Sequence, residues 1–208
     1  MVQNGGWNEK TWQTKHSFMR YQVILYTVGI VLLVMGGLQA IPALLDLSDA
    51  NSDAWAFFWC GLLELFLGGA LYFSFRGFDA RVSLREAFLL TNAAWLTMTV
   101  AGALPFWFST IDAPITDAVF EAVSGITTTG ATVFTGLDTM PRGILMWRGI
   151  LHGVGGIGIV SLAILLLPFL HVGGMQLLQT ESSDKSEKLM PRTRDVVWSI
   201  TWVYIVLN

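Results

Sequence analysis

Charged residues are scarce in this chain: Asp, Glu, Lys and Arg make up 13% of its 208 residues, about half their usual share in a soluble domain. The formal net charge of -3 leaves no basic surplus to neutralise phosphates, so nucleic acid is not expected as a partner. A single cysteine, Cys60, excludes an internal disulfide, and one cysteine with three scattered histidines cannot assemble a metal cluster. We therefore expect no resident cofactor.

Apolar residues, in contrast, make up 53% of the chain and gather in long runs. Each run has at least the roughly 20 residues that a helix needs to cross the hydrocarbon core of a bilayer. The first run has no small-residue cleavage site, so we interpret it as a retained helix and not a signal peptide. The sequence therefore predicts an all-α, multi-pass membrane protein. The four predicted spans are Tyr21–Leu45, Ala54–Phe75, Ala87–Phe108 and Gly143–Phe169.

The positive charges fall mainly on one side of these spans. Of the twelve basic residues, only Arg142, in the connection before the fourth span, and Arg148, near the start of that span, would face the other side. Lys and Arg concentrate in cytoplasmic loops, so we expect a cytoplasmic N-terminus in the cell (inner) membrane, with the lipid bilayer as the first partner. The remaining ten are Lys10, Lys15, Arg20, Arg76, Arg81, Arg85, Lys185, Lys188, Arg192 and Arg194.

A short helix is predicted over Pro114–Ile126, between the third and fourth spans. Either Asp112 or Thr116 could cap it, and Pro114 suits its first turn. A helix of about 13 residues cannot cross a bilayer, and both flanking spans end outside. We therefore expect a re-entrant pore helix that enters from the outside and returns there. Its predicted apolar face is Val119, Phe120 and Val123.

A run of small and hydroxyl residues, Ser124–Thr132 (S-G-I-T-T-T-G-A-T), follows this helix. Non-helical backbone at membrane depth is tolerated only where it is buried in protein or lines a water-filled cavity. Its free carbonyls could replace the water around a cation, and the negative end of the helix points at the same place. Gly130 can adopt positive φ, while Thr127, Thr128 and Thr129 suit an extended strand. The run predicts part of an ion pathway.

Charged residues flank the run. Asp117 and Glu121, four residues apart on one helix face, could raise the cation concentration at an external mouth, or they could be a solvated acidic loop. Arg148 and His152, also four apart, could anchor the loop by binding its carbonyls or Glu121. Alternatively, Arg148 extends to lipid headgroups. Gly153, Gly155, Gly156 and Gly158 favour close packing of another helix or the loop.

Glu64 lies in the middle of the second span, where a charge is costly and an acid is a functional candidate by default. Its position among Gly61, Gly68 and Gly69, away from the Thr/Gly run, also fits a structural role. Protonation, or a bond to Asn92 or Thr91 of the third span, would satisfy it.

These residues resemble the Trk/Ktr/HKT superfamily of potassium transporters, and in particular its Trk-type membrane subunit. The matching stretches are Phe120–Thr132, Trp147-Arg148, Gly155–Ile159 and Val172–Leu177. The resemblance implies a pore ringed by four unequal helix–pore loop–helix repeats, preceded by two extra helices. It places filter carbonyls, which bind the transported K⁺, on Thr128 and Thr129, with Gly130 as the filter glycine and Thr127, Glu121 and Arg148 as supporting residues. Members with serine at that glycine tend to pass sodium, so Gly130 indicates potassium.

The resemblance also implies an organisation and partners. Residues 1–80 would hold the cytoplasmic tail and the extra helix pair, 81–195 the first repeat with a cytoplasmic linker, and 196–208 the start of a second repeat. One pore loop cannot ring an ion, so we expect that the chain is incomplete and unable to transport by itself, as a truncated gene product, a partial sequence or a fragment. The implied partners are a cytoplasmic nucleotide-binding regulatory subunit and a second copy of the protein in a homodimer. The polar segment His171–Asp195 could contact the regulatory subunit, and a plain linker between repeats is equally consistent with its sequence.

Two other functions stay open at this stage. One is an inactive scaffold that only packs or dimerises. The other is a membrane-embedded enzyme that uses Glu64, His152 and Asp117, although no nucleophile–base spacing, metal-ligand set or phosphate-binding motif supports it. We therefore do not expect an enzyme.

Overall fold

Six α-helices make up most of the described part of the chain. The computed structural model describes residues 9–77, 84–166 and 202. The predicted linker His171–Asp195 and the stretch from Val196 fall outside the described residues, Trp202 excepted. Within the described ranges there is no strand, so the expected all-α architecture is confirmed. The elements are α1 (Glu9–Leu38), α2 (Ala40–Ser48), α3 (Asp53–Phe75), α4 (Leu84–Phe108), α5 (Ile115–Ile126), a 3₁₀ turn η1 (Leu137–Thr139) and α6 (Arg142–Leu166).

Four segments are long and apolar enough to cross a membrane: Tyr21–Ser48, Asp53–Phe75, Glu86–Phe108 and Arg142–Val160. Each begins within one residue of its predicted start. The first is formed by α1 and α2 together. Large apolar side chains remain exposed on these helices, among them Phe66 at 72%, which is typical of a surface that faces lipid. The chain is a multi-pass membrane protein.

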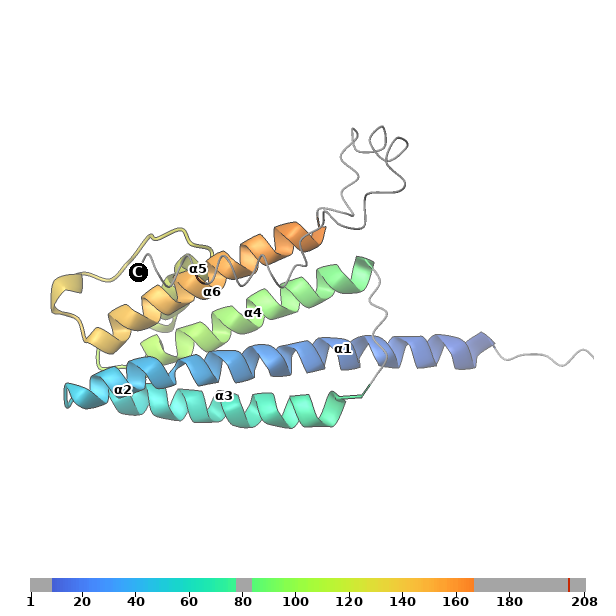
Figure 1. The fold of residues 1–208 in the computed structure, drawn as a ribbon, viewed down its shortest axis with the longest axis horizontal. Helices are drawn as coiled ribbons and strands as arrows, with labels where there is room; N and C mark the ends of the chain where they lie inside the picture. Colours follow the sequence, from blue (N-terminus) through green and yellow to red (C-terminus); the bar gives the residue numbers. More distant parts are fainter. Residues whose placement is uncertain (1–8, 78–83, 167–201, 203–208) are drawn as a thin grey trace, which may run out of the picture.

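Successive long helices run in opposite directions along one axis (Figure 1). α3 runs back along α1, α4 packs against α1, and α5 packs between α4 and α6. Because each long helix reverses direction, the α2–α3 turn, the end of α4 and the start of α6 gather at one end of the bundle, on the left in Figure 1, and α5 lies in the same half, with its last residue against Gly155 in the middle of α6. The starts of α1 and α4 and the end of α3 lie towards the other end. The Thr/Gly run follows α5 and lies beside the middle of α6, where a Cβ atom on Gly156 would be 3.8 Å from Cγ2 of Thr128.

Pairs of glycines let α1 and α3 approach each other closely. A Cβ atom on Gly36 would lie 2.8 Å from the carbonyl oxygen of Gly61, and one on Gly68 would lie 2.8 Å from the carbonyl oxygen of Gly29. Without a hydrophobic driving force between helices in lipid, such close backbone contact supplies the packing energy. Gly37 and Gly69 have open space beside them and do not contribute to this contact.

The buried core lies where α1, α3, α4, α5 and α6 meet. Trp147 of α6 is fully buried, and its indole Nε1 donates a hydrogen bond of 2.9 Å to the carbonyl oxygen of Gly102 in α4. Its ring meets Phe57 of α3 edge to face, with ring centroids 6.2 Å apart. An aromatic pair of this geometry contributes about 0.5–1.5 kcal/mol beyond its burial. Trp147 of α6 therefore connects α3 to α4 and α6.

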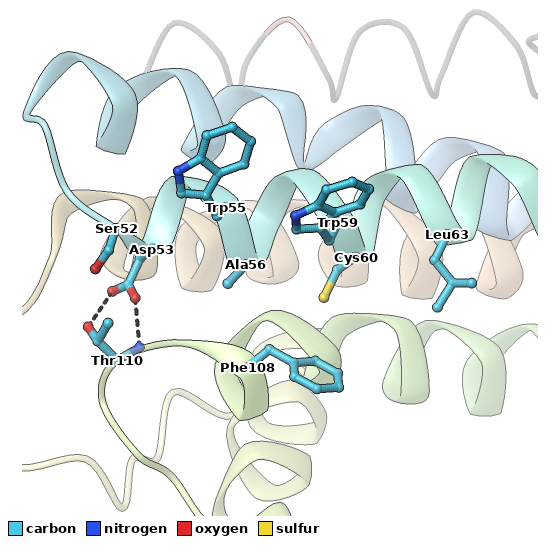
Figure 2. A pocket seen from close by; sticks show the side chains of 9 residues that line it. All are labelled: Ser52, Asp53, Trp55, Ala56, Trp59, Cys60, Leu63, Phe108 and Thr110. Carbon is cyan, nitrogen blue, oxygen red and sulfur yellow. Dashed lines mark hydrogen bonds between the residues drawn. The ribbon is translucent and has the colours of Figure 1, made fainter.

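Two buried aspartates connect α2 and α3 to the other helices through hydrogen bonds. Asp46 of α2 is fully buried, and its Oδ1 accepts the backbone N–H of Gly143 at the start of α6, at 2.7 Å. Asp53 of α3 accepts the backbone N–H of Thr110 at 2.6 Å and its hydroxyl at 3.0 Å (Figure 2). The sequence analysis missed both roles, because charges in a short connection are expected to be solvated.

A cavity of about 430 Å³ lies between α3 and α4 (Figure 2). Its polar end is the Asp53–Thr110 contact, in which the carboxylate is already bonded twice. Trp55, Trp59, Leu63 and Phe108 are among the apolar residues that line it.

Glu64 binds a different partner from the predicted ones. It is buried, and its Oε1 accepts a hydrogen bond of 2.8 Å from Nε2 of Gln39, where α1 meets α2. Thr91 and Asn92 bond instead to carbonyls of their own helix, those of Ala87 and Phe88. The prediction of a bond from Glu64 to α4 is wrong, because α1 and not α4 supplies the neighbouring polar side chain.

Candidate ion-coordination site

The predicted short helix is present as α5, Ile115–Ile126. Pro114 precedes it as the N-cap residue, with extended backbone, and no side chain caps the helix. The predicted cap by Asp112 or Thr116 is therefore wrong. Asp112 adopts a φ of 52°, and the hydroxyl of Thr116 instead lies 3.3 Å from the carboxylate of the half-buried Asp117.

The buried face of α5 also differs from the prediction. Four small residues, together with Glu121 and Ile126, form the buried face, and the three residues of the predicted apolar face remain outside. Small side chains let helices approach each other closely. Buried are Ala118, Glu121, Ala122, Ser124, Gly125 and Ile126. The predicted apolar face, Val119, Phe120 and Val123, is instead 38%, 43% and 40% exposed.

α5 ends in a turn and not in an extended strand. The backbone N–H of Thr128 donates to the carbonyl of Gly125 at 2.9 Å, and that of Thr129 donates to the carbonyl of Ser124 at 3.0 Å. This pair of bonds is the Schellman arrangement, with Thr128 at the left-handed position and a φ of 57°. Glycine usually takes this position, because a β-branched residue there costs about 1 kcal/mol or more. The extended conformation predicted for the threonines is therefore wrong at Thr127 and Thr128.

After this turn the chain runs along an exposed face. Gly130 has a φ of 77°, as the sequence predicted. Thr127, Thr128, Thr129 and Gly130 are all exposed, and the hydroxyls of Thr127 and Thr129 lie 2.8 Å apart. Among the described residues, no hydrogen bond ends on the carbonyl oxygen of Thr128, Thr129 or Gly130. These three oxygens are therefore available as ligands.

Glu121 holds the returning arm of the loop. Its carboxylate is 1% exposed, and its Oε1 accepts the hydroxyl of Thr132 and the backbone N–H groups of Val133, at 2.8 Å, and Phe134, at 3.4 Å. Its Oε2 accepts Nε of Arg148 at 2.9 Å. Bonds to a charged acceptor are roughly twice as strong as neutral ones. The contact between Arg148 and Glu121 is thus present, but Glu121 is a buried anchor and not an acid at an open mouth.

A second bond closes the loop onto α5. The hydroxyl of Ser124 donates to the carbonyl oxygen of Ala131 at 2.5 Å. The chain from Ser124 to Ala131 is thus pinned at both ends, and Glu121 fixes the three residues that follow. The exposed carbonyls between these anchors belong to a loop of defined shape.

One face of α6 supports the loop from behind. Arg148 forms an ion pair with Glu121. On the following turns of α6, His152, Gly155 and Gly156 lie against the end of α5 and the loop. A Cβ atom on Gly155 would lie 2.7 Å from Cα of Ile126, and one on Gly156 would lie 3.8 Å from Cγ2 of Thr128. The predicted close packing is therefore present at Gly155, whereas a Cβ on Gly158 would have open space.

The sequence matches the TrkH family, described as "Cation transport protein", over residues 53–208. The chain belongs to this family. The Trk system potassium uptake protein TrkI of Halomonas elongata is 38% identical over 188 residues, which cover 89% of this chain and 38% of that protein. The Trk system potassium uptake protein TrkH of Escherichia coli K12 is 37% identical over 193 residues, which cover 91% of this chain and 40% of that protein.

A solved structure agrees with this assignment. The crystal structure of the potassium transporter TrkH from Vibrio parahaemolyticus matches with a TM-score of 0.74 and 31% identity, over 89% of this chain and 37% of that one. The resemblance seen in the sequence is confirmed. The chain spans about two fifths of the length of these TrkH-family relatives.

The three residues considered for an enzyme each have other partners. Glu64 binds Gln39, Asp117 lies against Thr116, and Nδ1 of His152 is 2.7 Å from the carbonyl oxygen of Arg148. No group of three or more His, Cys, Asp or Glu side chains that could hold a metal occurs in the described part of the chain. The relatives in the TrkH family are named as uptake proteins and transporters.

Sequence reasoning missed the residues that Glu121 binds. Thr132, Val133 and Phe134 lie 11 to 13 positions further along the chain, and two of the three contacts use only backbone N–H groups, which leave no mark on the sequence. The position of Glu121 in the middle of a short helix that leads into a polar loop was the one signal in the sequence that could have indicated a loop anchor.

Proposed function

We propose that this chain forms one side of a potassium pathway in a membrane uptake system, with the carbonyl oxygens of Thr128 and Thr129 as ion ligands and Gly130 as the filter glycine. The observation that carries this proposal is the set of exposed carbonyls without hydrogen-bond donors, in a loop anchored at Ser124 and Glu121. Carbonyl oxygens at fixed positions replace the hydration shell of a potassium ion.

The end of α5 adds an electrostatic contribution. The C-terminal end of a helix carries about half a negative elementary charge, and the loop with the free carbonyls starts directly at Thr127, the C-cap of α5. A cation beside Thr128 and Thr129 would therefore be favoured over an anion. The supporting residues Glu121 and Arg148 form an ion pair and add little net charge of their own.

The choice of potassium rests on the relatives and on Gly130. The proteins from Halomonas elongata and Escherichia coli are named as potassium uptake proteins. Gly130 keeps the loop free of a side chain at a position where, among the described residues and apart from its chain neighbours, a Cβ atom would have one heavy atom within 4 Å. Because a single loop supplies ligands from one side, the pathway requires further loops, from other segments of the same protein or from other copies.

The placement in the membrane is part of the proposal. α5 starts at the end of the bundle to which its loop returns (Figure 1), which supports a re-entrant helix. Among the described residues, Arg142 and Arg148 lie in the first part of α6, towards that end, whereas the starts of α1 and α4 and the end of α3, at the other end, carry Lys10, Lys15, Arg20, Arg76 and Arg85. This excess of basic residues supports a cytoplasmic N-terminus, with α5 on the outside. A nucleotide-binding regulatory protein and a second copy are the proposed partners.

Substitution of Gly130 by serine tests the proposed function. The longest reading frame that contains this chain would be expressed in a host without potassium uptake of its own, and the ratio of potassium to sodium uptake would be measured per amount of protein in the membrane. Serine strains the positive-φ conformation by roughly 1 kcal/mol or more and adds an oxygen that can ligate or crowd the ion. A differential effect of about 1.4 kcal/mol would lower the ratio about tenfold.

An unchanged ratio with less protein in the membrane would make Gly130 a residue of folding only. Absence of potassium uptake by the expressed wild-type protein would overturn the proposed function itself.

A further inference from the structure

A hydrogen bond between Gln39 and Glu64 joins the junction of α1 and α2 to the middle of α3. Nε2 of Gln39 donates to Oε1 of Glu64 at 2.8 Å, and the two side chains are 0% and 1% exposed. Glycines on both helices make room for the pair. A Cβ atom on Gly36 would lie 3.1 Å from Cβ of Glu64, and one on Gly61 would lie 3.4 Å from Oε1 of Gln39. The pair therefore lies in the closely packed part of the α1–α3 contact.

This bond leaves one oxygen at each of its ends without a partner. Oε1 of Gln39 and Oε2 of Glu64 are both buried, and neither accepts a hydrogen bond from the described residues. The backbone of Gln39 is fully paired, because its N–H donates to Met35 and its carbonyl oxygen accepts from Ala43. Buried polar groups as a rule have a hydrogen-bond partner. Two unpaired oxygens on side chains that already bind each other therefore require a common explanation.

The surroundings of Glu64 supply neither a counter-charge nor a donor. Glu64 lines a cavity of about 310 Å³ between α1, α3 and α4, and it is the only ionisable residue in the lining. The hydroxyl of Thr97, the other polar side chain there, donates to the carbonyl oxygen of Ala93 at 2.7 Å. The nearest ionisable residue along α3, Cys60, is a buried thiol.

The rest of the cavity lining is leucine, valine and alanine. A water molecule there would lack the roughly two to four polar partners that a buried water needs. A charge in the middle of a membrane span is costly without a partner. The unpaired oxygen of Glu64 is therefore explained neither by a bound water nor by an ionised carboxylate.

We propose that Gln39 and Glu64 form a proton-binding site inside the membrane, in which Glu64 is a neutral acid and its Oε2 hydroxyl donates to Oε1 of Gln39. A protonated carboxyl group is both a donor and an acceptor, and so is the amide of glutamine. The two groups then form a cyclic pair with two hydrogen bonds. A single proton satisfies both unpaired oxygens and removes the charge from the bilayer.

The ligand of this site is a proton, and its role is to hold α3 against α1 and α2. The inference does not depend on potassium transport by the protein.

Glu121 provides the matched contrast, because it is also 1% exposed but binds Nε of Arg148. Glutamine at position 64 supplies an N–H in place of the acid O–H and keeps the cyclic pair, whereas Glu121→Gln leaves Arg148 without its counter-charge. The longest reading frame that contains this chain would be purified in detergent. We expect Glu64→Gln to unfold within about 2 °C of the wild type, and Glu121→Gln at least about 4 °C below it. An equal loss in both variants would overturn the inference.

Infrared spectroscopy detects the proton itself, because the carbonyl stretch of a protonated carboxyl group is separate from the bands of carboxylates and amides. At neutral pH, the difference between wild type and Glu64→Gln should contain one protonated-carboxyl band. The difference between wild type and Glu121→Gln should contain none. If Glu64→Gln removes no such band, Glu64 is ionised and the proposed site does not exist.

Substitution of Gln39 tests whether the proton lies between the two side chains. Gln39→Leu, or the unbranched Gln39→Met if that variant does not accumulate, removes both the donor and the acceptor that the acid uses. The band of Glu64 should then move to higher frequency, since its carbonyl loses a hydrogen bond. A band that keeps its frequency would show that Gln39 does not share the proton, which also overturns the inference.

Discussion

Arg148 of α6 and Glu121 of α5 form a buried ion pair in which Nε and Oε2 are 2.9 Å apart. The Glu121 side chain is 1% exposed and that of Arg148 is 14% exposed. Since the same carboxylate accepts backbone N–H groups of Val133 and Phe134, the pair connects α5, α6 and the returning arm of the loop. The ion pair is thus one of the contacts that fix the loop with the exposed carbonyls, beside the bond from Ser124 to Ala131.

Removal of one member of this pair should be more harmful than removal of both. Arg148→Met would leave the Glu121 carboxylate buried without its counter-charge, a loss of about 3–5 kcal/mol. The combination of Arg148→Met with Glu121→Gln keeps the acceptor oxygen for the loop and removes the unpaired charge, so it should recover part of that loss. The thermal unfolding midpoint of the purified protein in detergent measures both. A double variant less stable than Arg148→Met would show that the pair does not act as a unit.

Gly155→Ala should disturb the loop, and Gly158→Ala should not. A methyl group on Gly155 collides with the backbone of Ile126, one residue before the C-cap of α5, whereas one on Gly158 meets no heavy atom of the described residues within 4 Å. Backbone cannot move aside as a flexible side chain can, so α5 and the loop must shift. We expect at least a tenfold loss of potassium uptake per protein for Gly155→Ala and normal uptake for Gly158→Ala. Equal uptake by the two variants would contradict the close contact.

Gln39→Leu should destabilise the packing of α1 and α2 against α3. It removes the donor to Glu64, whose other carboxylate oxygen already has no partner among the described residues. A buried polar group left unsatisfied costs about 1–3 kcal/mol. The combined variant Gln39→Leu, Glu64→Leu removes both polar groups and should unfold at a higher temperature than Gln39→Leu alone. If the combined variant is instead the less stable one, the hydrogen bond does not explain the position of Glu64.

Labelling of introduced cysteines tests the orientation. In a variant without Cys60, cysteines at Asp49 and Asp138 should react with a membrane-impermeant reagent from outside, because both belong to the end of the bundle at which α5 lies (Figure 1). A cysteine at Arg81, in the connection between the second and third spans, should react only after the membrane is opened. External labelling at Arg81 with protection at Asp49 would reverse the proposed orientation and the re-entrant loop with it.

Local features of the sequence determined the number of spans, their starts, the length of α5 and the positive φ of Gly130. Each is the property of one contiguous stretch: an apolar length of about 20 residues, a short helix after a proline, or a residue without Cβ. Membrane helices are read well from sequence because the bilayer forces every backbone group to bond within its own segment.

Only the tertiary structure decided which side chains meet. The burial of small residues and not of Val119, Phe120 and Val123 on α5, and the choice of Gln39 as the partner of Glu64, depend on how segments far apart in the chain pack together. The left-handed conformation of Thr128 runs against its own local preference, and it coexists with the hydrogen bonds that end α5 and the anchors on Ser124 and Glu121. The sequence by itself predicted a Thr/Gly loop after α5 whose carbonyl oxygens could bind a cation. The hydrogen bonds of the folded loop decided which carbonyls are used within the described residues and which, at Thr128, Thr129 and Gly130, are not.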